Sequence, residues 1–177
     1  CEPRSGYGRA CLSGVHIATS KMVVFMDADG ADNPVHIHEL LTPLMNTTAD
    51  MTIGSRFLGE MQPGAMPWHQ QLGNRLAVWL IGIRFGVAPT DLGPFRAVNR
   101  RMLINLDMRE MSYGWTTEMT VKAIDNGWCI KEIPVKHRPR LAGNSKISGI
   151  IRGTILAAYH IFSVIFTFQQ KGLLPNE

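Results

Sequence analysis

An apolar run that ends in two acidic residues constrains this chain more than any other feature. The run is Val23-Val24-Phe25-Met26, and it passes directly into Asp27-Ala28-Asp29-Gly30. Short apolar runs that contain β-branched residues are typical of strands buried in a parallel sheet. Gly30 and the turn over residues 31–34 would end such a strand abruptly. We therefore expect an α/β fold in which this strand carries both carboxylates at its carboxyl end.

Two carboxylates at the end of a strand suit a hard divalent cation. Ligands of open α/β sheets bind beyond the carboxyl ends of the strands, and Mg²⁺ or Mn²⁺ shares its shell between carboxylates and substrate phosphates. Asp27 and Asp29 are therefore the candidate metal ligands. A solvated acidic turn is the alternative. A calcium-binding EF-hand loop is excluded, because Asp32 and His38 stand where Gly and Glu are required.

Length and charge limit the class of the protein and its partners. With 177 residues, 45% of them hydrophobic and 18% charged, the chain fits one globular domain. The net charge of +4 favours anionic partners. No basic run interleaved with aromatic residues is present, so nucleic acid is not expected among them. Three scattered cysteines indicate a reducing, cytosol-facing environment, and we interpret His36 and His38 as surface residues.

Apolar periodicity and turn residues predict alternating helices and strands along the chain. Besides the acidic strand, strands are expected over residues 51–57 and 129–135, with a short one after the turn that begins at residue 90. Helices are expected over residues 9–19, 34–45, 68–85, 100–106 and 114–125. Arg56 ends the second strand, so we expect it at the same sheet edge as Asp27 and Asp29. Because a parallel sheet would not begin with its functional strand, we also expect an N-terminal portion to be absent.

Seven short motifs, each present once, follow one another over nearly the whole chain. They are Gly6-Tyr7-Gly8, Met26-Asp27-Ala28-Asp29-Gly30, Gly54-Ser55-Arg56-Phe57, Asp91-Leu92-Gly93-Pro94-Phe95-Arg96, Gly114-Trp115-Thr116-Thr117-Glu118, Glu132-Ile133-Pro134-Val135, and Arg140-x-x-Gly143-x-Ser145-Lys146. Together they resemble family 2 glycosyltransferases of the GT-A fold, in the branch of dolichol-phosphate mannose synthase and bacterial polyprenyl-phosphate glycosyltransferases.

The resemblance implies a Rossmann-like, mixed and mostly parallel sheet flanked by helices. Residues 1–146 would form a partial GT-A domain, whose first, base-binding strands belong to the absent N-terminal part. Residues 147–177 would form an apolar helix and tail, for which a membrane interface is one location. The implied activity is an inverting, metal-dependent transfer of a sugar from a GDP- or UDP-sugar to a polyprenyl phosphate on the cytoplasmic face of a membrane.

The same resemblance assigns roles to the acidic and basic residues. A Mg²⁺ or Mn²⁺ ion held by Asp27 and, more directly, Asp29 would neutralise the leaving diphosphate. The family often has Gln where this chain has Ala31, and Asp32 or water would fill that place. The candidate phosphate-binding residues are Asp27, Arg56, Arg96, Arg138, Arg140, Ser145 and Lys146. The alternatives are a surface position for Arg56 and an ion pair with Asp91 for Arg96. For Arg138, Arg140, Ser145 and Lys146 the alternative is a solvated basic loop.

The candidate catalytic carboxylates are Asp29, Asp91 and Glu118. Transfer to a hydroxyl needs a base, and many family 2 enzymes that act on hydroxyls carry an adjacent Glu-Asp pair. Here Met119 follows Glu118, which fits an acceptor that is already an anion. A structural cap or a sugar-binding role for Glu118 stays open.

The apolar tail leaves its own alternatives open. Residues 153–168 form a stretch of 16 residues without Asp, Glu, Lys or Arg, shorter than the roughly 20 that cross a bilayer. Arg152 and Lys171 flank it, which fits an interfacial helix, whereas a buried core helix or dimer helix is the alternative.

Two other functions remain: a soluble or carbohydrate acceptor on the same fold, and a non-catalytic nucleotide- or lipid-binding module. A nucleotidyltransferase would need a Gly-rich phosphate loop, which the chain lacks.

Overall fold

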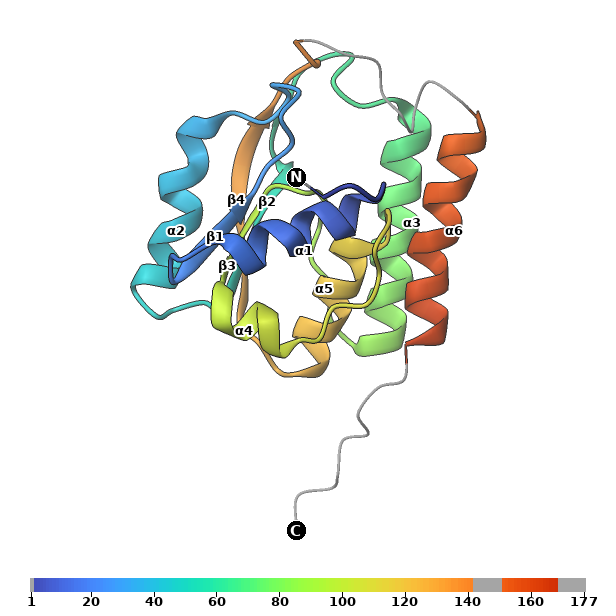
Figure 1. Cartoon of the computed structure of the whole chain (residues 1–177). Helices are drawn as coiled ribbons and strands as arrows, with labels where there is room; N and C mark the ends of the chain where they lie inside the picture. Colours follow the sequence, from blue (N-terminus) through green and yellow to red (C-terminus); the bar gives the residue numbers. More distant parts are fainter. Residues whose placement is uncertain (1, 142–150, 169–177) are drawn as a thin grey trace.

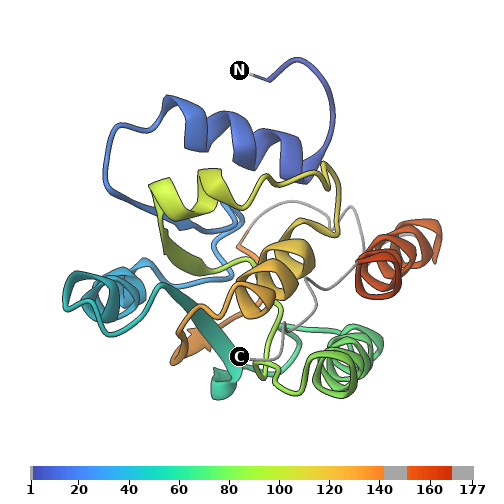
Figure 2. The ribbon, with the colours of Figure 1, turned by 90° about the horizontal axis from the view of Figure 1, so that it is seen from below.

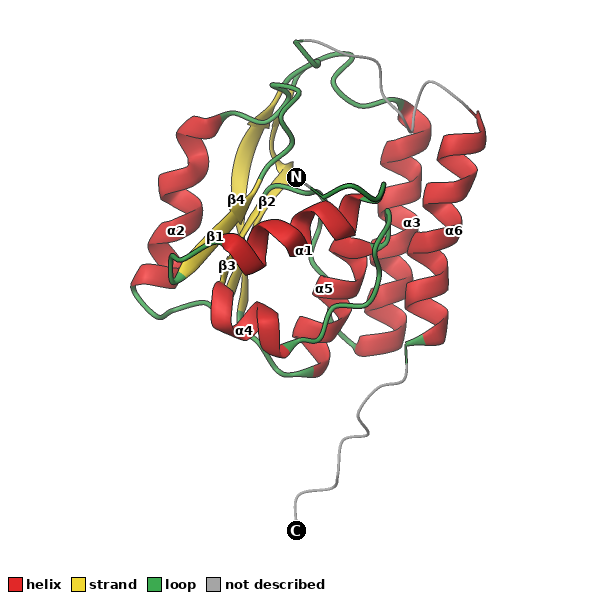
Figure 3. Cartoon of the chain, in the orientation of Figure 1, coloured by secondary structure: helices red, strands yellow, loops and turns green. Residues whose placement is uncertain are grey.

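The structure is a computed structural model that describes residues 2–141 and 151–168, the latter with side chains from residue 155 onward. Helices and strands alternate along the chain (Figures 1 and 3). The helices are α1 (Tyr7–Ile17), α2 (Ile37–Met45), α3 (Trp68–Phe85), α4 (Arg100–Asn105), α5 (Trp115–Asp125) and α6 (Ile151–Thr167). The strands are β1 (Met22–Phe25), β2 (Met51–Met61), β3 (Arg96–Asn99) and β4 (Ile130–His137), and a short 3-10 turn, η1 (Pro34–His36), precedes α2.

The four strands form one mixed sheet in the order β1-β3-β2-β4. Strand β3 runs antiparallel to both of its neighbours, whereas β2 and β4 are parallel. Strands β1, β2 and β4 therefore point the same way, and their carboxyl ends meet at one edge of the sheet. The expected mixed sheet flanked by helices is confirmed, but two of the three pairings are antiparallel. The acidic strand, expected to be buried within a parallel sheet, is the partly exposed β1 at one end of this sheet, where it pairs only with the antiparallel β3.

Helices cover both faces of this sheet. Helix α2 lies on one face, where Leu40 packs against Phe95 and Val135. Helices α1, α4 and α5 lie on the other face (Figure 1). There the buried residues of one cluster come from both layers; they are Val15, Met51, Ile53, Val98, Leu103, Leu106, Met108, Trp115, Met119 and Ala123. Burial of these apolar side chains holds the layers together.

Helices α3 and α6 form a further layer beyond α5. They lie side by side at the edge of the molecule, and α5 separates them from the sheet (Figures 1 and 2). Ile81 of α3, Val121 of α5 and Ile165 of α6 pack in one buried cluster. No helix in the described parts of the chain is both long enough and apolar enough to cross a bilayer.

Local sequence accounts for several of the boundaries. The Asn99 side chain accepts hydrogen bonds from the N–H groups of Arg101 and Met102, so it ends β3 and caps α4. Gly86 ends α3 in the left-handed region at φ 77°. The prediction that His36 is a surface residue is wrong: it is 9% exposed, and its ring contacts Glu39 and the N–H of Lys136.

Candidate functional site

The acidic and basic candidates meet at the carboxyl ends of the parallel strands. Asp27 and Asp29 follow β1, while Arg138 and Arg140 follow β4. Arg56 lies within β2, in the irregular part where β2 loses its register with β4 between Ser55 and Glu60. One edge of the sheet thus presents both signs of charge.

Backbone hydrogen bonds join the acidic loop to the basic segment. The N–H of Arg138 donates to the carbonyl of Ala31, and the N–H of Leu141 donates to that of Asp29, both at 3.0 Å. The Arg138 Nε also donates to the Gly30 carbonyl at 2.8 Å. These bonds place Arg140 Nη1 3.0 Å from Asp29 Oδ2, in a partly exposed ion pair. The acidic residues near the start and the first part of the basic loop therefore face each other.

A buried hydrogen bond between a histidine and an aspartate reinforces the same junction. His137 Nδ1 lies 3.0 Å from Asp32 Oδ1, and both side chains are under a tenth exposed. His137 belongs to the end of β4, where its carbonyl accepts the N–H of Gln62 beyond β2. The pair fixes the acidic loop against both strands.

Arg56 is held in place by a two-pronged ion pair with Asp91. Its Nε and Nη2 donate to the two carboxylate oxygens at 2.7 and 2.6 Å, and its backbone N–H donates to Oδ2 at 3.0 Å. Burial alone would raise the pKa of Asp91, but the hydrogen bonds and charge of Arg56 outweigh it and lower that pKa. Asp91 is therefore an ionised, fully buried partner of Arg56, and the alternative of a pair between Asp91 and Arg96 is not what the structure contains.

Polar residues from three elements secure the segment that carries Asp91. The Thr90 hydroxyl donates to Glu132 of β4 at 2.6 Å and shares a 2.7 Å hydrogen bond with Ser55 of β2. The Asn74 side chain of α3 donates to the Thr90 carbonyl at 3.2 Å and accepts the Leu92 N–H at 3.0 Å. These contacts fix the position of Asp91, and through it the position of Arg56.

Asp27 differs from its acidic neighbours because its carboxylate has no hydrogen bond or ion pair with any described residue. It is half-buried, and burial raises its pKa, with the charges of Asp29 and Asp32 adding to the effect. A half-buried carboxylate without a partner, beside two further carboxylates, is an environment that a hard cation relieves. No three metal-binding side chains converge closely enough to hold an ion alone, within the described residues. The donor set therefore fits a Mg²⁺ or Mn²⁺ ion that takes its remaining ligands from phosphate oxygens and water.

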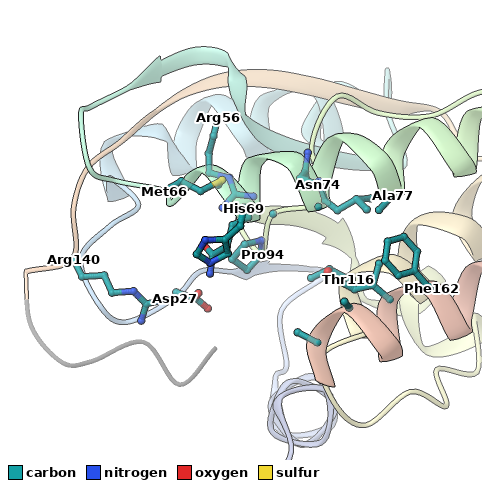
Figure 4. Close-up of a pocket in the computed structure, with 17 residues that line it drawn as sticks. Asp27, Arg56, Met66, His69, Asn74, Ala77, Pro94, Thr116, Arg140 and Phe162 are labelled. Atoms are coloured by element: carbon teal, nitrogen blue, oxygen red, sulfur yellow. The ribbon is translucent and has the colours of Figure 1, made fainter. Parts of the chain in front are cut away.

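These residues line the polar end of a crevice. Figure 4 shows Asp27, Arg56 and Arg140 at one end and Ala77, Thr116 and Phe162 at the other. The crevice has a volume of about 260 Å³, and a smaller polar hollow of about 70 Å³ adjoins it beside Asp29, Asp32 and His137. Its walls come from the acidic loop, β2, α3, the turn after Leu92 and the inner side of α6. One space is therefore charged at the sheet edge and apolar between α3 and α6.

Two candidates lie away from this charged end. Arg96 is fully buried, its guanidinium donates to the carbonyls of Gly93 and Thr116, and burial lowers its pKa to about 10. Glu118 accepts the backbone N–H groups of residues 109 and 110 and pairs with Lys122 at 2.8 Å. It borders a separate hollow of about 570 Å³. Ser145 and Lys146 lie outside the described residues.

Sequence reasoning missed the wall that α3 contributes to the crevice. His69, Gln70 and Asn74 line it from the first two turns of this helix, and Gly73 and Ala77 leave room beside them. The available signal was a group of polar and small residues on one side of a helix that is rich in apolar residues. Glu132 and His137 were also missed, because each acts through a partner far away in the sequence.

Known proteins share both the sequence pattern and the fold. Residues 1–107 match the family described as glycosyl transferase family 2. A Mycobacterium tuberculosis protein named as an uncharacterized glycosyltransferase is 34% identical over 167 residues, which are 93% of this chain and 74% of that protein. The polyprenol monophosphomannose synthase of Mycolicibacterium smegmatis is 29% identical over 153 residues, 82% of this chain and 57% of that enzyme.

The fold resembles that of a solved glycosyltransferase. Glucosyl-3-phosphoglycerate synthase from Mycobacterium tuberculosis, in complex with Mg²⁺ and uridine diphosphate, superposes with a TM-score of 0.68 at 17% identity. The alignment covers 94% of this chain and 57% of that one, so the chain spans little more than half the length of this structure. With the fold, the family match and the 34% identical relative in agreement, the chain belongs to glycosyl transferase family 2.

Proposed function

We propose that this protein transfers a sugar, with inversion, from a nucleotide-sugar donor to a polyprenyl phosphate in a metal-dependent reaction. The observation that carries the proposal is the crevice itself. Its charged end, lined by Asp27, Arg56 and Arg140, suits a diphosphate with its cation, and its apolar end suits a hydrocarbon chain. The name of the 29% identical mycobacterial relative, a polyprenol monophosphomannose synthase, supports the same acceptor class.

The donor diphosphate would bind between the acidic loop and the basic residues. Asp27 and Asp29 would hold Mg²⁺ or Mn²⁺, which neutralises charge on the leaving diphosphate when bound. Arg56 and Arg140, which both line the crevice, would bind phosphate oxygens. Asp91 would act as a positioning residue, because it engages two of the three guanidinium nitrogens of Arg56 and leaves Nη1 to face a ligand.

Further basic residues complete the proposed phosphate site. Arg138 would contribute charge from beside the acidic loop, where its Nε is already bonded to the Gly30 carbonyl. Ser145 and Lys146 would approach from the segment that follows Leu141. Arg96, which is buried beneath the Gly93 turn, would shape the turn between Asp91 and Pro94 rather than touch phosphate.

A phosphate acceptor removes the need for a strong base. Both oxygens of Asp91 are engaged by Arg56 and its pKa is lowered, so it is a poor proton acceptor near neutral pH. Glu118 faces the other hollow, where it anchors the backbone of residues 109 and 110. Neither is assigned as a base; an anionic acceptor needs positioning and charge screening instead.

The decisive experiment measures sugar transfer by the purified protein with UDP- and GDP-sugars, with and without Mn²⁺. We expect transfer to a short-chain prenyl phosphate and not to a soluble sugar. Asp29→Asn should reduce Mn²⁺-dependent transfer by at least about a hundredfold, because it removes a charge from the site where the leaving diphosphate is neutralised.

Asp107→Asn is the matched control for this substitution. The Asp107 side chain is 72% exposed and lies outside the crevice, so the variant should transfer sugar like the unmodified protein. Transfer by Asp29→Asn at the rate of Asp107→Asn would refute the assigned site. Transfer to a soluble sugar with equal efficiency would replace the prenyl acceptor by a carbohydrate one.

A further inference from the structure

The middle of the crevice, between its charged and its apolar end, is lined by polar side chains from two helices. His69 and Gln70 lie in the first turn of α3, and Thr116 lies in the first turn of α5. Figure 4 shows the His69 ring between Arg140 at the charged end and Phe162 at the apolar end. A group that is bound at the charged end and continues along the crevice therefore passes these side chains.

The polar atoms of these three side chains are not engaged elsewhere. The imidazole of His69, the amide of Gln70 and the hydroxyl of Thr116 form no hydrogen bond or ion pair with any residue that the structure describes. The backbone carbonyl of Thr116 accepts Arg96 Nη1 at 3.0 Å, which holds this residue in place. A ligand that fills the crevice removes water from such groups, so it has to offer them hydrogen bonds in return.

The other polar side chains at the start of α3 have structural partners. The Gln71 amide nitrogen donates to the Met66 carbonyl at 2.9 Å, which ties the helix to the loop before it. The Asn74 side chain is bonded at 3.2 and 3.0 Å to the backbone of residues 90 and 92. This contrast indicates that the side chains of His69 and Gln70 are not needed to hold α3 in place and are available to a ligand.

Gln70 lies where two spaces meet. It lines the crevice and also the smaller polar hollow beside Asp29 and His137. A sugar is joined directly to the outer phosphate of its nucleoside diphosphate, so a diphosphate at the charged end would place the sugar next to Gln70. Gly73 leaves room there, because a Cβ added to it would meet no atom within 4 Å. Glu118, for which the sequence left a sugar-binding role open, borders a separate hollow.

We propose that His69, Gln70 and Thr116 bind the hydroxyl groups of the transferred sugar, and that Gln70 contributes most to the choice of sugar. The proposal deepens the proposed function and rests on it for the binding of a nucleotide-sugar. An amide offers two N–H donors and an acceptor oxygen, which suits neighbouring hydroxyls on a sugar ring. None of the three residues is Lys or Arg, so the site suits a neutral hexose better than a uronic acid, whose carboxylate calls for a cation. A site built to bond a hydroxyl rejects a sugar without it, because the protein groups are then left unpaired.

The phosphate of the acceptor is the competing ligand for this part of the crevice. It would gain a charged partner only from a protonated His69, whereas Gln70 and Thr116 would offer it neutral hydrogen bonds. Arg56 and Arg140 are stronger phosphate ligands, and both line the crevice at its charged end. The composition of the middle of the crevice therefore favours hydroxyl groups over a second phosphate.

The test measures binding of the donor sugar without any acceptor. Isothermal titration calorimetry with Mn²⁺ compares UDP-glucose with UDP, and GDP-mannose with GDP, for the unmodified protein and for Gln70→Met. Methionine keeps the length of the side chain and removes its hydrogen-bonding atoms. For the nucleotide that binds more tightly, we expect Gln70→Met to weaken binding of the nucleotide-sugar roughly tenfold. The Kd of the corresponding nucleoside diphosphate should stay unchanged.

Gln62→Met is the matched control. Gln62 is exposed in the loop between β2 and α3 and lines neither the crevice nor the polar hollow. This variant should bind both ligands like the unmodified protein. Gln70 has no side-chain partner among the described residues, so Gln70→Met should keep the Tm and the near-ultraviolet circular dichroism of the unmodified protein.

Monodeoxy analogues of the sugar identify the hydrogen bonds one by one. The unmodified protein should bind at least one monodeoxy nucleotide-sugar more weakly than the parent donor, and Gln70→Met should bind the two equally. Thr116→Val keeps the shape of the side chain and the carbonyl that holds Arg96, so it provides a second variant. It should lose discrimination at a different hydroxyl of the sugar.

Three results would overturn the sugar-binding proposal. They are equal binding of the nucleotide-sugar by Gln70→Met and Gln62→Met, an equal loss for nucleotide-sugar and nucleoside diphosphate, and a loss in Gln70→Met of geranyl phosphate binding alone. The proposed reaction stands or falls separately. Sugar transfer to a prenyl phosphate with no effect of Gln70→Met on donor binding would keep the reaction and remove the sugar site. Selective loss of sugar binding in a protein that transfers nothing to a prenyl phosphate would keep the sugar site and remove the acceptor.

Discussion

The ion pair between Arg56 and Asp91 determines how the crevice presents its positive charge. Asp91 is completely buried and Arg56 is mostly buried, so neither charge is solvated and each depends on the other. Burial alone would lower the pKa of Arg56, but the hydrogen bonds and charge of Asp91 outweigh it and raise that pKa. Arg56 is therefore charged at neutral pH.

Removing the buried partner should cost both stability and donor binding. We expect Asp91→Asn to lower the free energy of unfolding by about 3 kcal/mol, because it leaves the Arg56 charge buried and unpaired. Urea denaturation measures this loss, and the donor KM should rise because Arg56 is no longer fixed. Glu60→Gln is the control: Glu60 pairs with Lys136 with both side chains 68% exposed, so its loss should cost under about 0.5 kcal/mol. Equal costs for the two variants would contradict the buried role of Asp91.

The same pair gives a pH dependence with a defined sign. The pKa of Asp91 is lowered on folding, so its contribution to stability is complete above its unfolded value of about 3.9 and is lost as the pH falls through the folded value. The difference in unfolding free energy between the unmodified protein and Asp91→Asn should therefore shrink below about pH 4. Urea titrations at pH 7 and pH 3.5 compare the two. A difference that is constant with pH would mean that Asp91 is not charged in the folded protein.

Asp27 should show the opposite behaviour, because its pKa is raised. Its ionised form is destabilised in the folded protein once the pH exceeds the unfolded value, and a bound cation would remove that penalty. We expect Asp27→Asn to raise the Tm of the metal-free protein at pH 7 by a few degrees and to abolish stabilisation by Mn²⁺. Differential scanning fluorimetry with and without Mn²⁺ measures both effects. Mn²⁺ stabilisation that persists in Asp27→Asn would remove this residue from the metal site.

At the scale of the elements, close approach of β2 and β4 is what brings Arg56 to the crevice. Beyond the break in register at Ser55, Gly59 lies against the backbone of Val135 so closely that a Cβ there would collide with it. A glycine at this position lets β2 pass close to Val135 and resume its pairing with β4 at Glu60 and Met61. The irregular stretch is therefore a requirement of the site and not a defect in the strand.

Gly59→Ala should separate these strands and lower stability. We expect a loss of about 2–3 kcal/mol in unfolding free energy, the usual cost of overpacking against groups that cannot move, together with weaker donor binding. Gly14→Ala is the matched control, because Gly14 is exposed in α1 and a Cβ there meets nothing. In a helix this change should stabilise by up to about 1 kcal/mol. Chemical denaturation compares the two, and equal effects would show that β2 and β4 are not tightly apposed at Gly59.

The elements were predictable from the sequence, whereas their neighbours in the sheet were not. Apolar periodicity alone predicted a helix over residues 68–85, which are the bounds of α3 in the structure. Strand β3 was expected too, but nothing local reveals that it runs antiparallel between β1 and β2. Tertiary packing sets that order, because β3 must bury Ala97 and Val98 on opposite faces of the sheet.

At the scale of the whole molecule, only those parts of the site whose positions follow from the direction of the strands were predictable. Strand ends that point the same way must meet, so Asp29 and Arg140 could be brought together from the sequence alone. The sequence does not reveal which carboxylate pairs with Arg56, because Asp91 lies 35 residues away and no spacing rule links the two. The contribution of α3 was hidden because its docking beside α6 depends on three helices packing together.

The contact between residues 29–32 and residues 137–141 has a consequence for the way in which a metal ion and a nucleotide would bind. In the protein by itself, Arg140 serves as the counter-ion of Asp29. In the proposed reaction, Asp29 would have to exchange that guanidinium for a metal ion, and Arg140 would then be free to bind the diphosphate. Each ligand would thus raise the affinity of the protein for the other, and by thermodynamic linkage the two increases are equal. We therefore expect cation and nucleotide to enter as cooperating ligands, with the built-in salt link as the barrier to either entering alone.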